Sequence, residues 1–271
     1  MRQAPPASPA PPRGILHRHT AVDVVHDRRL PAEDLAPFVA HLWSVRWNLA
    51  DPIEVETLSH PAVHLVVEVD HDDGSVRGEV AGPHLRKFAR HLKGRGQVFG
   101  VKFRPAMFRR WWHGSVAELV DAPRPLHDVG GGLDVEALVA VTAAATPFVD
   151  QLDAVSAILR AAMPPLLADD VQLRDLVETM ADDPTIVGVD DLVAISGLSA
   201  RTLQRRFKDV LGVSPKWVLQ RYRLHEAAMR LRQPNPPPLA DLAATLGYAD
   251  QAHFARDFRA TIGVPPGRFT G

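Results

Sequence analysis

Four polar side chains in the second half of the sequence have the spacing of one helix face and the chemistry to bind nucleic-acid bases. They are Arg201, Gln204, Arg205 and Lys208. Apolar residues recur with the same period on the opposite face: Leu203, Phe207, Val210 and Leu211. In a major groove an arginine can donate two hydrogen bonds to guanine, and a glutamine can pair in the same way with adenine. The segment therefore has the properties of a helix that packs through one face and reads DNA through the other.

A helix-turn-helix motif would position these side chains. The sequence predicts a short helix over 190–196, a turn at Gly197 and a second helix over 199–211. Ser199 is expected to cap the second helix, because a serine hydroxyl accepts a hydrogen bond from a free backbone N–H of the first turn. In such motifs the second helix enters the major groove.

The motif occurs twice. Residues Asp191, Leu192, Ala194 and Gly197 recur 50 residues later as Asp241, Leu242, Ala244 and Gly247. Residues Leu203, Phe207, Gly212 and Pro215 recur 51 residues later as Phe254, Phe258, Gly263 and Pro266. A helix over 215–232 is expected to join the two units, with a length of about 27 Å at about 1.5 Å per residue. Successive major grooves lie about 34 Å apart, so one chain could place two recognition helices in them.

Charge is distributed unevenly along the 271 residues. From Gly188 onward the chain carries a net charge of +5, and the remainder carries −6. A basic module beside an acidic one fits a polyanionic ligand for one half only. The absence of cysteine excludes disulfides, thiolate metal sites and cysteine nucleophiles. No apolar run approaches the roughly 18 residues of a membrane span, and we expect a cytoplasmic protein without a membrane partner.

The first half of the sequence predicts an α+β organisation, with a β-rich domain before the all-α module. Residues 1–20 are expected to be a disordered tail, because proline is frequent there. Residues 21–165 are expected to form a barrel or cupin-like sheet with helices at its C-terminal end, and residues 170–271 the module with two helix-turn-helix units. Short strands are expected over 39–49, 53–58, 63–69, 76–81 and 97–104, and helices over 105–112, 135–145 and 147–163.

Residues 170–270 resemble the AraC/XylS family of bacterial transcription regulators. The resemblance rests on Gly197-Leu198-Ser199-x-x-x-Leu203-x-x-x-Phe207, Gly212-Val213-Ser214-Pro215, Leu242-Ala243-x-x-Leu246-Gly247-Tyr248-x-Asp250, Phe254-x-x-x-Phe258 and Gly263-Val264-Pro265-Pro266. The N-terminal part is similar to an uncharacterised domain that precedes some AraC-type modules, through Trp43-Ser44-Val45-Arg46-Trp47, His60-Pro61-Ala62-Val63-His64-Leu65 and Phe99-Gly100-Val101-Lys102-Phe103-Arg104-Pro105. The resemblance implies a regulator that binds double-stranded DNA and has a sensor or dimerisation domain of unknown ligand.

The resemblance also implies which residues meet the DNA. The expected set is Ser199, Arg201, Thr202, Gln204, Arg205, Lys208, Lys216, Gln251, Ala252, Ala255, Arg256 and Arg259. Bases would be read by Arg201, Gln204 and Arg205 in the first unit and by Gln251, Ala252, Ala255 and Arg256 in the second. Phosphates would be bound by Lys208, Lys216, Arg221 and Arg259, and such contacts position the protein without specifying sequence. RNA polymerase, a second copy of the chain and an unknown small-molecule effector are the further partners that we expect, and no cofactor is expected.

A metal-dependent cupin-like enzyme or sensor fused to a DNA-binding module is the alternative. Residues His60, His64 and Glu68 would share one face of a strand, and imidazole with carboxylate can hold a divalent metal. The favoured interpretation is a strand over 63–69 that is buried on both faces and flanked by hydrogen-bonded histidines. Four tryptophans present a similar choice between an effector pocket and an aromatic core, and we favour the core: Trp43, Trp47, Trp111 and Trp112.

Overall fold

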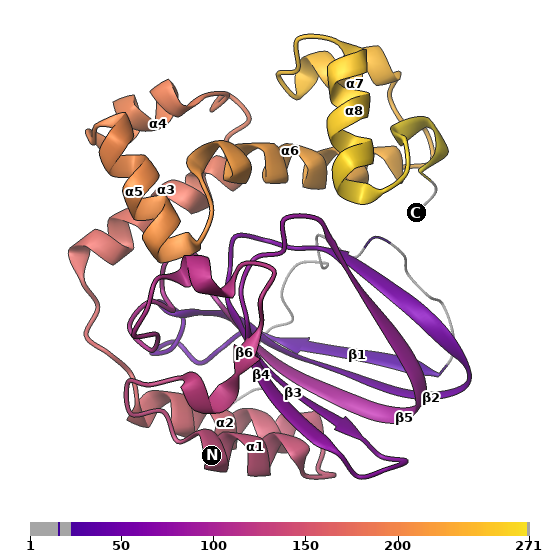
Figure 1. Cartoon of the computed structure of the whole chain (residues 1–271), viewed down its shortest axis with the longest axis vertical. Coiled ribbons are helices and arrows are strands. Elements are labelled where there is room, and N and C mark those ends of the chain that lie inside the picture. Colours follow the sequence, from indigo (N-terminus) through magenta and orange to yellow (C-terminus); the bar gives the residue numbers. More distant parts are fainter. Residues whose placement is uncertain (1–15, 17–22, 270–271) are drawn as a thin grey trace.

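The first half of the chain forms mainly an antiparallel sheet, and the second half forms mainly helices (Figure 1). The computed structural model describes Leu16 and residues 23–269. The expected disordered tail over 1–20 lies outside the described residues except for Leu16. Among the described residues, no helix is both long and apolar enough to cross a membrane.

Six strands form one sheet in the order β1-β2-β5-β3-β4-β6, and every neighbouring pair is antiparallel. Their bounds are β1 Val24–Arg29, β2 Val39–Leu58, β3 His64–Asp70, β4 Val76–Ala81, β5 Lys87–Phe103 and β6 Arg124–Pro125. The two long strands, β2 and β5, pair along almost their whole length. The expected α+β class with an N-terminal sheet is therefore confirmed.

The sheet differs from the sequence-based expectation in several details. The expected strands included neither β1 nor β6. The two strands expected over 39–49 and 53–58 are one strand, β2, with a shift of register between Leu49 and Ile53. Most of the polar segment 84–96 belongs to β5, because its backbone pairs with β2 whatever its side chains are. Strand β3 is not buried on both faces: Leu65, Val67 and Val69 are buried, and the residues between them are only half-buried.

One face of the sheet carries the core of the N-terminal domain. Phe99, Val101 and Phe103 of β5 pack there with Trp111 and with helices α1 (Val135–Ala143) and α2 (Phe148–Ala161). A helix expected over 105–112 is instead a run of turns. Val149 of α2 is 54% exposed, because the stripe that packs inward starts at Phe148.

The helices expected in the C-terminal part are confirmed, with ends that differ by a few residues. They are α3 Ala168–Asp182, α4 Val189–Ser196, α5 Ala200–Leu211, α6 Pro215–Leu231, α7 Leu239–Thr245 and α8 Gln251–Ile262, followed by the short 3-10 helix η3 Pro266–Arg268. Helices α4, α5 and α8 end at glycines in the left-handed conformation. These glycines supply positive φ at the C-cap without steric cost.

The two helix-turn-helix units belong to different cores. Leu192, Leu203 and Phe207 of the first unit are continuous with the core of the sheet domain. Phe254 and Phe258 of the second unit pack in a separate cluster with residues from the far half of α6 and with Leu58 at the end of β2. Helix α6 thus links a unit whose core is continuous with that of the sheet domain and a unit whose separate cluster meets the sheet domain at Leu58 (Figure 1).

Candidate nucleic-acid interface

Helix α5 has the two faces that its sequence predicts. Leu203, Phe207 and Leu211 are buried, whereas Arg201, Gln204 and Arg205 are exposed. The hydroxyl of Ser199 accepts a hydrogen bond from the Thr202 backbone N–H at 3.2 Å, which caps the helix as expected. The Thr202 hydroxyl lies 2.9 Å from the same Ser199 oxygen, so both residues shape the N-terminus of α5.

Helix α8 repeats this arrangement. Phe254, Phe258 and Ile262 are buried, and Asp250 caps the helix by accepting a hydrogen bond from the backbone N–H of His253 at 2.6 Å. On the outer face Gln251, Ala252 and Arg256 are exposed, and Ala255 is half-buried. The second unit therefore presents a less charged surface than the first.

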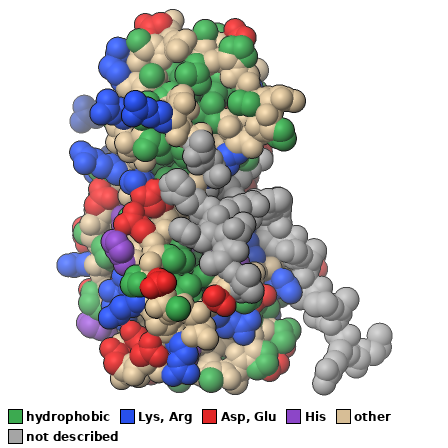
Figure 2. All heavy atoms as spheres, turned by 90° about the vertical axis from the view of Figure 1, so that its right-hand side faces the viewer, with side chains coloured by type: hydrophobic (Ala, Val, Ile, Leu, Met, Phe, Trp, Pro, Cys, Tyr) green, Lys and Arg blue, Asp and Glu red, His purple; other side chains and the backbone are tan. Residues whose placement is uncertain are grey.

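Several cations on these elements are not engaged by the protein. Among Leu16 and residues 23–269, no hydrogen bond or ion pair holds the side chains of Arg201, Arg205, Lys216, Arg256 and Arg259. The neighbouring Arg206 differs, because its guanidinium donates to Gln172 Oε1 and to the Asp169 carbonyl of α3. Figure 2 shows Lys and Arg side chains gathered along one edge of the helical part of the molecule. Unpaired exposed cations on repeated helix faces are suited to an external anion.

Two of the basic residues that were expected to contact phosphates form hydrogen bonds with backbone carbonyls of the protein instead. Lys208 Nζ donates to the Gly212 carbonyl at 3.2 Å, at the end of α5 that faces the sheet domain. Arg221 contradicts the expectation, because it is only 2% exposed. Its guanidinium donates to the carbonyls of His84 and Leu85 at 3.1 and 2.7 Å and lies over the Trp217 ring. Burial lowers the pKa of Arg221 to about 10, so it remains a cation at neutral pH.

Polar contacts along α6 fix the two units relative to each other. Gln220 Nε2 donates to Asp257 Oδ2 of α8 at 2.6 Å, and Arg223 Nη2 donates to the Val187 carbonyl before α4 at 2.5 Å. The Arg223 guanidinium also lies 5.8 Å from the centre of the Tyr248 ring. A hollow of about 300 Å³ lies between the units, with Lys216 and residues of both units in its wall.

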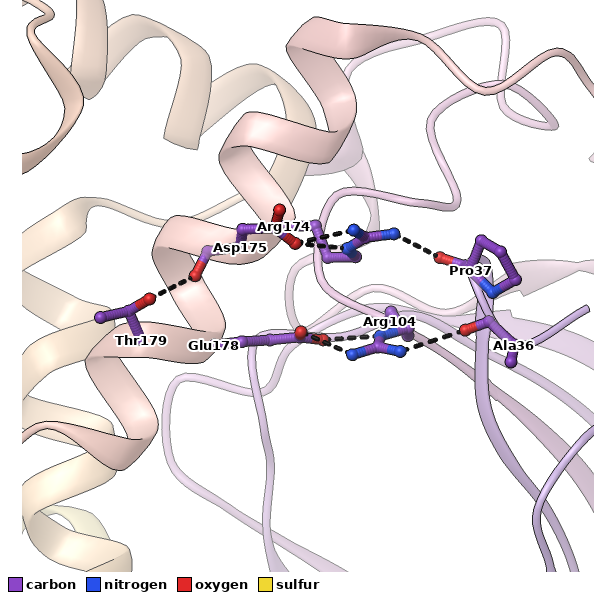
Figure 3. Close-up of polar contacts among 7 residues, drawn as sticks. All are labelled: Ala36, Pro37, Arg104, Arg174, Asp175, Glu178 and Thr179. Atoms are coloured by element: carbon purple, nitrogen blue, oxygen red, sulfur yellow. Dashed lines mark hydrogen bonds and ion pairs between the residues drawn. The ribbon is translucent and has the colours of Figure 1, made fainter. Parts of the chain in front are cut away.

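The sheet domain is tied to the first unit by polar contacts that no sequence pattern had indicated. Arg104, just after β5, makes an ion pair with Glu178 of α3, and Arg174 of α3 donates to the Pro37 carbonyl at 3.2 Å (Figure 3). Ser115, which caps the 3-10 helix η1 (Val116–Leu119), lies 3.4 Å from the Asp209 carbonyl of α5. The partners are distant in sequence, so neither periodicity nor spacing could have revealed them.

The three residues of the metal alternative do not come together. His60 lies outside β3, and its ring stacks on His225 of α6 with 4.1 Å between ring centres. His64 lies on β3 beside Trp43, and Glu68 is held by Arg77 and Arg90. No group of three His, Cys, Asp or Glu side chains suited to a metal occurs in the part of the chain that the structure describes.

The four tryptophans are mostly core. Trp47, Trp111 and Trp112 are at most 7% exposed, which confirms the expected aromatic core for these three. Trp43 is only half-buried and lies on the opposite face of the sheet from Trp111.

Two family models match separate parts of the chain. A helix-turn-helix domain matches residues 192–271, and a domain of unknown function, DUF6597, matches residues 27–123. The transcriptional regulator MtrA of Neisseria gonorrhoeae is 30% identical over 101 residues, which are 37% of this chain and 33% of MtrA. A putative AraC-like transcription regulator of Streptomyces lividans is 34% identical over 103 residues, which are 38% of this chain and 34% of the relative.

Among solved structures, an AraC-type DNA-binding domain regulator from Chromobacterium violaceum is 25% identical, with a TM-score of 0.34. That match covers 36% of this chain and 88% of the other. The chain spans about a third of the length of the two curated relatives it matches. The predicted resemblance is confirmed: the C-terminal part is an AraC-type helix-turn-helix domain, and the sheet part is a domain of unknown function.

Proposed function

We propose that the chain is a sequence-specific DNA-binding transcription regulator of the AraC/XylS type, with α5 and α8 in successive major grooves. One observation carries the proposal: two repeated units each expose a helix face with arginines that have no partner among the described residues, Arg201 and Arg205 on α5 and Arg256 and Arg259 on α8. Helix α6 spaces the units, and its 17 residues correspond to about 26 Å. Neighbouring major grooves lie about 34 Å apart, a separation of the same order as this length.

The two recognition helices would contribute differently. Arg201, Gln204 and Arg205 can each pair with base edges, and a good two-point contact discriminates between bases by about 1–3 kcal/mol. In α8 the methyl groups of Ala252 and Ala255 would contact thymine methyls, and Gln251 and Arg256 would supply the polar contacts. We therefore infer that the first unit provides more of the base specificity.

Phosphate contacts would come mainly from Lys216 at the start of α6 and Arg259 near the end of α8, both exposed. Lys208 is the weaker candidate, because its ammonium group already bonds to Gly212. Ser199 and Thr202 are placed at the N-terminus of α5, where backbone N–H groups can also approach a phosphate.

The sheet domain would act as the regulatory part. It contacts α3 through Glu178, α5 through Asp209 and α6 through Arg221 and His225. A small-molecule effector that alters the sheet domain could therefore alter how the two units are held. A second copy of the chain and RNA polymerase are the further partners that we propose for this role, and no catalytic step is needed for it. A regulator of this kind would act in the cytoplasm, where bacterial DNA lies.

The experiment that tests the proposal is selection of DNA from a random library by the purified full chain, with sequencing of the bound fraction. We expect one enriched motif with two parts about 10 base pairs apart, because each part is read by one unit. Binding to the motif should weaken steeply with salt, by about 0.9 in log affinity per log salt for each phosphate contact. A bound fraction with no enriched motif would refute sequence-specific binding.

A further inference from the structure

A row of basic side chains crosses the sheet of the N-terminal domain on the face away from its core. His41 of β2 lies opposite Lys102 of β5, and Lys102 lies opposite His64 of β3. The residues one position along, Leu42, Val101 and Leu65, are buried in the core. Successive side chains of a strand point to opposite faces, so the three basic groups share the other face.

Arg28 of the edge strand β1 extends this row. It pairs in register with Trp43, and its Nη2 donates to His41 Nδ1 at 3.0 Å. A guanidinium has no acceptor atom, so His41 Nδ1 must be unprotonated in this contact. The neutral imidazole of His41, only 8% exposed, is thus held between two cationic neighbours.

Among the described residues, no carboxylate forms an ion pair with His41, His64 or Lys102. Burial, then the charge of Lys102, lowers the pKa of His41 to about 2 and that of His64 to about 3. Burial, then Arg28, lowers the pKa of Lys102 to about 7. His84 is the other titratable neighbour; burial lowers its pKa, and Asp121 and Glu79 oppose that effect. The first 22 residues of the sequence contain neither Asp nor Glu, so that segment offers no carboxylate either.

Two hydrogen-bond donors in the row have no acceptor in Leu16 or residues 23–269. Lys102 is half-buried and makes no hydrogen bond or ion pair there. The Trp43 indole lies flat against Gly100, where an added Cβ would come within 2.1 Å of the ring. The indole Nε1 is buried without an acceptor, and the ring meets His64 edge-on at 6.1 Å. Buried donors without partners are costly, which makes the row a place where an acceptor would stabilise the protein.

Apolar side chains follow the basic row on the same face. In register, Trp43, Gly100 and Val66 lie one step beyond it, followed in that row by Glu79 of β4, and Val45 and Val98 lie two steps beyond, followed by Glu68 of β3. Both carboxylates are ion-paired with arginines, Glu79 with Arg77 and Glu68 with Arg77 and Arg90. These valines are half-buried, and Val45 and Val98 pack against the small cluster around Trp47. The face therefore offers positive charge at one end and apolar surface beside it, bordered on β3 and β4 by the ion-paired Glu68 and Glu79. This combination suits an organic anion better than an inorganic one.

We propose that this face binds a small organic acid, with Lys102 and the Trp43 indole N–H on its carboxylate and its apolar part along Trp43, Val45 and Val66. The inference deepens the effector-binding part of the proposed function by naming the chemical class and the site. Lys102 lies two residues before Arg104, whose ion pair holds α3, so the site adjoins the contact between the two domains.

Titration of the full chain with benzoate and hexanoate, each paired with its alcohol, benzyl alcohol or hexanol, tests the site. We expect both acids to bind and both alcohols to bind at least about tenfold more weakly, because only the acids engage the ammonium. Lys102→Met, which keeps the length of the side chain, should cost the acids at least about tenfold. The control Lys93→Met removes an exposed lysine of the same strand and should bind the acids as the wild type does.

A second readout separates binding at Lys102 from a change of folding. At about pH 8 the acids should bind with uptake of a proton, because an anion raises the pKa of an amine that is mostly neutral there. Titration in buffers of different ionisation enthalpy measures that proton, and Lys102→Met should abolish it. Acids that bind no better than alcohols, or that bind Lys102→Met unchanged, would overturn the inference. Stronger binding of inorganic phosphate would reassign the site to phosphate.

The experiments distinguish failure of the proposed DNA-binding function from failure of the proposed organic-acid site. A chain that binds its selected DNA motif but no carboxylate would retain the proposed function and lose this site. A chain that binds the acids but enriches no DNA motif would lose the proposed function and retain the site.

Discussion

The guanidinium of Arg104 and the carboxylate of Glu178 form a two-point ion pair across the boundary between the sheet and helix α3. Arg104 Nε and Nη2 donate to Glu178 Oε1 and Oε2 at 2.7 and 2.6 Å. A third bond runs from Arg104 Nη1 to the Ala36 carbonyl at 3.2 Å (Figure 3). The pair raises the pKa of Arg104, chiefly through its hydrogen bond with Glu178. One arginine thus connects the loop before β2, the end of β5 and the first helix of the C-terminal part.

Glu178→Gln should weaken that connection. We expect the free energy of unfolding to fall by about 1 kcal/mol, since both side chains are about a third exposed and water screens the pair. Urea unfolding of the full chain measures the change. Glu33→Gln is the control, because Glu33 is exposed and makes no ion pair among the described residues. An equal loss in both variants would show that the pair contributes nothing specific.

Gly212→Ala should damage the contact between α5 and the sheet domain. An added Cβ would lie 2.7 Å from Val120 Cγ2 and 2.8 Å from the Val116 carbonyl oxygen, at a φ of 79°. Gly197 has a similar φ of 69° but nothing within 4 Å of its Cβ position, so Gly197→Ala isolates the backbone cost of about 1 kcal/mol.

For Gly212→Ala we expect the free energy of unfolding to fall by about 1–3 kcal/mol more than for Gly197→Ala, because a backbone atom of Val116 cannot move aside easily. Thermal and urea unfolding of the two variants give the comparison. Equal losses would mean that η1 moves freely against α5 and that the sheet domain does not hold the first unit.

How far the sequence predicts this structure depends on whether the determining contacts are local. The helices and caps of the two units follow from residues within one turn, such as Ser199 beside Thr202. The length of β5 does not, because its polar half is a strand only through pairing with β2. Arg104 and Glu178 are 74 residues apart, and no local pattern relates them.

Arg221 is an intermediate case. Its charge suggested an exposed phosphate contact, yet its spacing from Trp217, Leu224 and Ala228 matches one helix face. Leu224 and Ala228 are buried on that face, so the period of α6 contained the signal that Arg221 points inward. Periodicity was the better guide there than residue type.

Stability should fall as the solution becomes acidic. The pKa values of His41 and His64 are lowered from 6.5 to about 2 and 3, so below about pH 6.5 the unfolded chain binds protons that the folded chain does not. The stabilisation is therefore complete above the unfolded pKa and is lost as the pH falls. The lowered pKa of Lys102 has the same effect at higher pH: it makes the folded state less stable as the pH falls from about 10.5 to 7.

The melting temperature between about pH 7 and pH 4 measures this loss. His64→Asn should flatten the decline, whereas His91→Asn should leave it unchanged, because the His91 side chain is 76% exposed. A decline that is equally steep in His64→Asn would place its cause elsewhere in the chain.

Arg201→Ala and Arg205→Ala should each weaken binding to the selected DNA motif by about 1–3 kcal/mol and relax the base preference at one position. Arg206→Ala is the matched control on the same helix, because its guanidinium bonds to α3. Competition binding against motifs with single base changes measures both effects. A variant that loses affinity equally for every sequence would assign its arginine to phosphate instead of a base.

The most direct test of the account is the affinity of the full chain for the selected motif with five base pairs inserted between its two parts. Half a helical turn rotates the second groove away from α8, and α6 is too rigidly tied to both units to follow. We predict that affinity falls to that for DNA with a single part of the motif, and that five base pairs inserted outside the motif change nothing. Unchanged affinity after the internal insertion would contradict the claim that α5 and α8 bind successive major grooves.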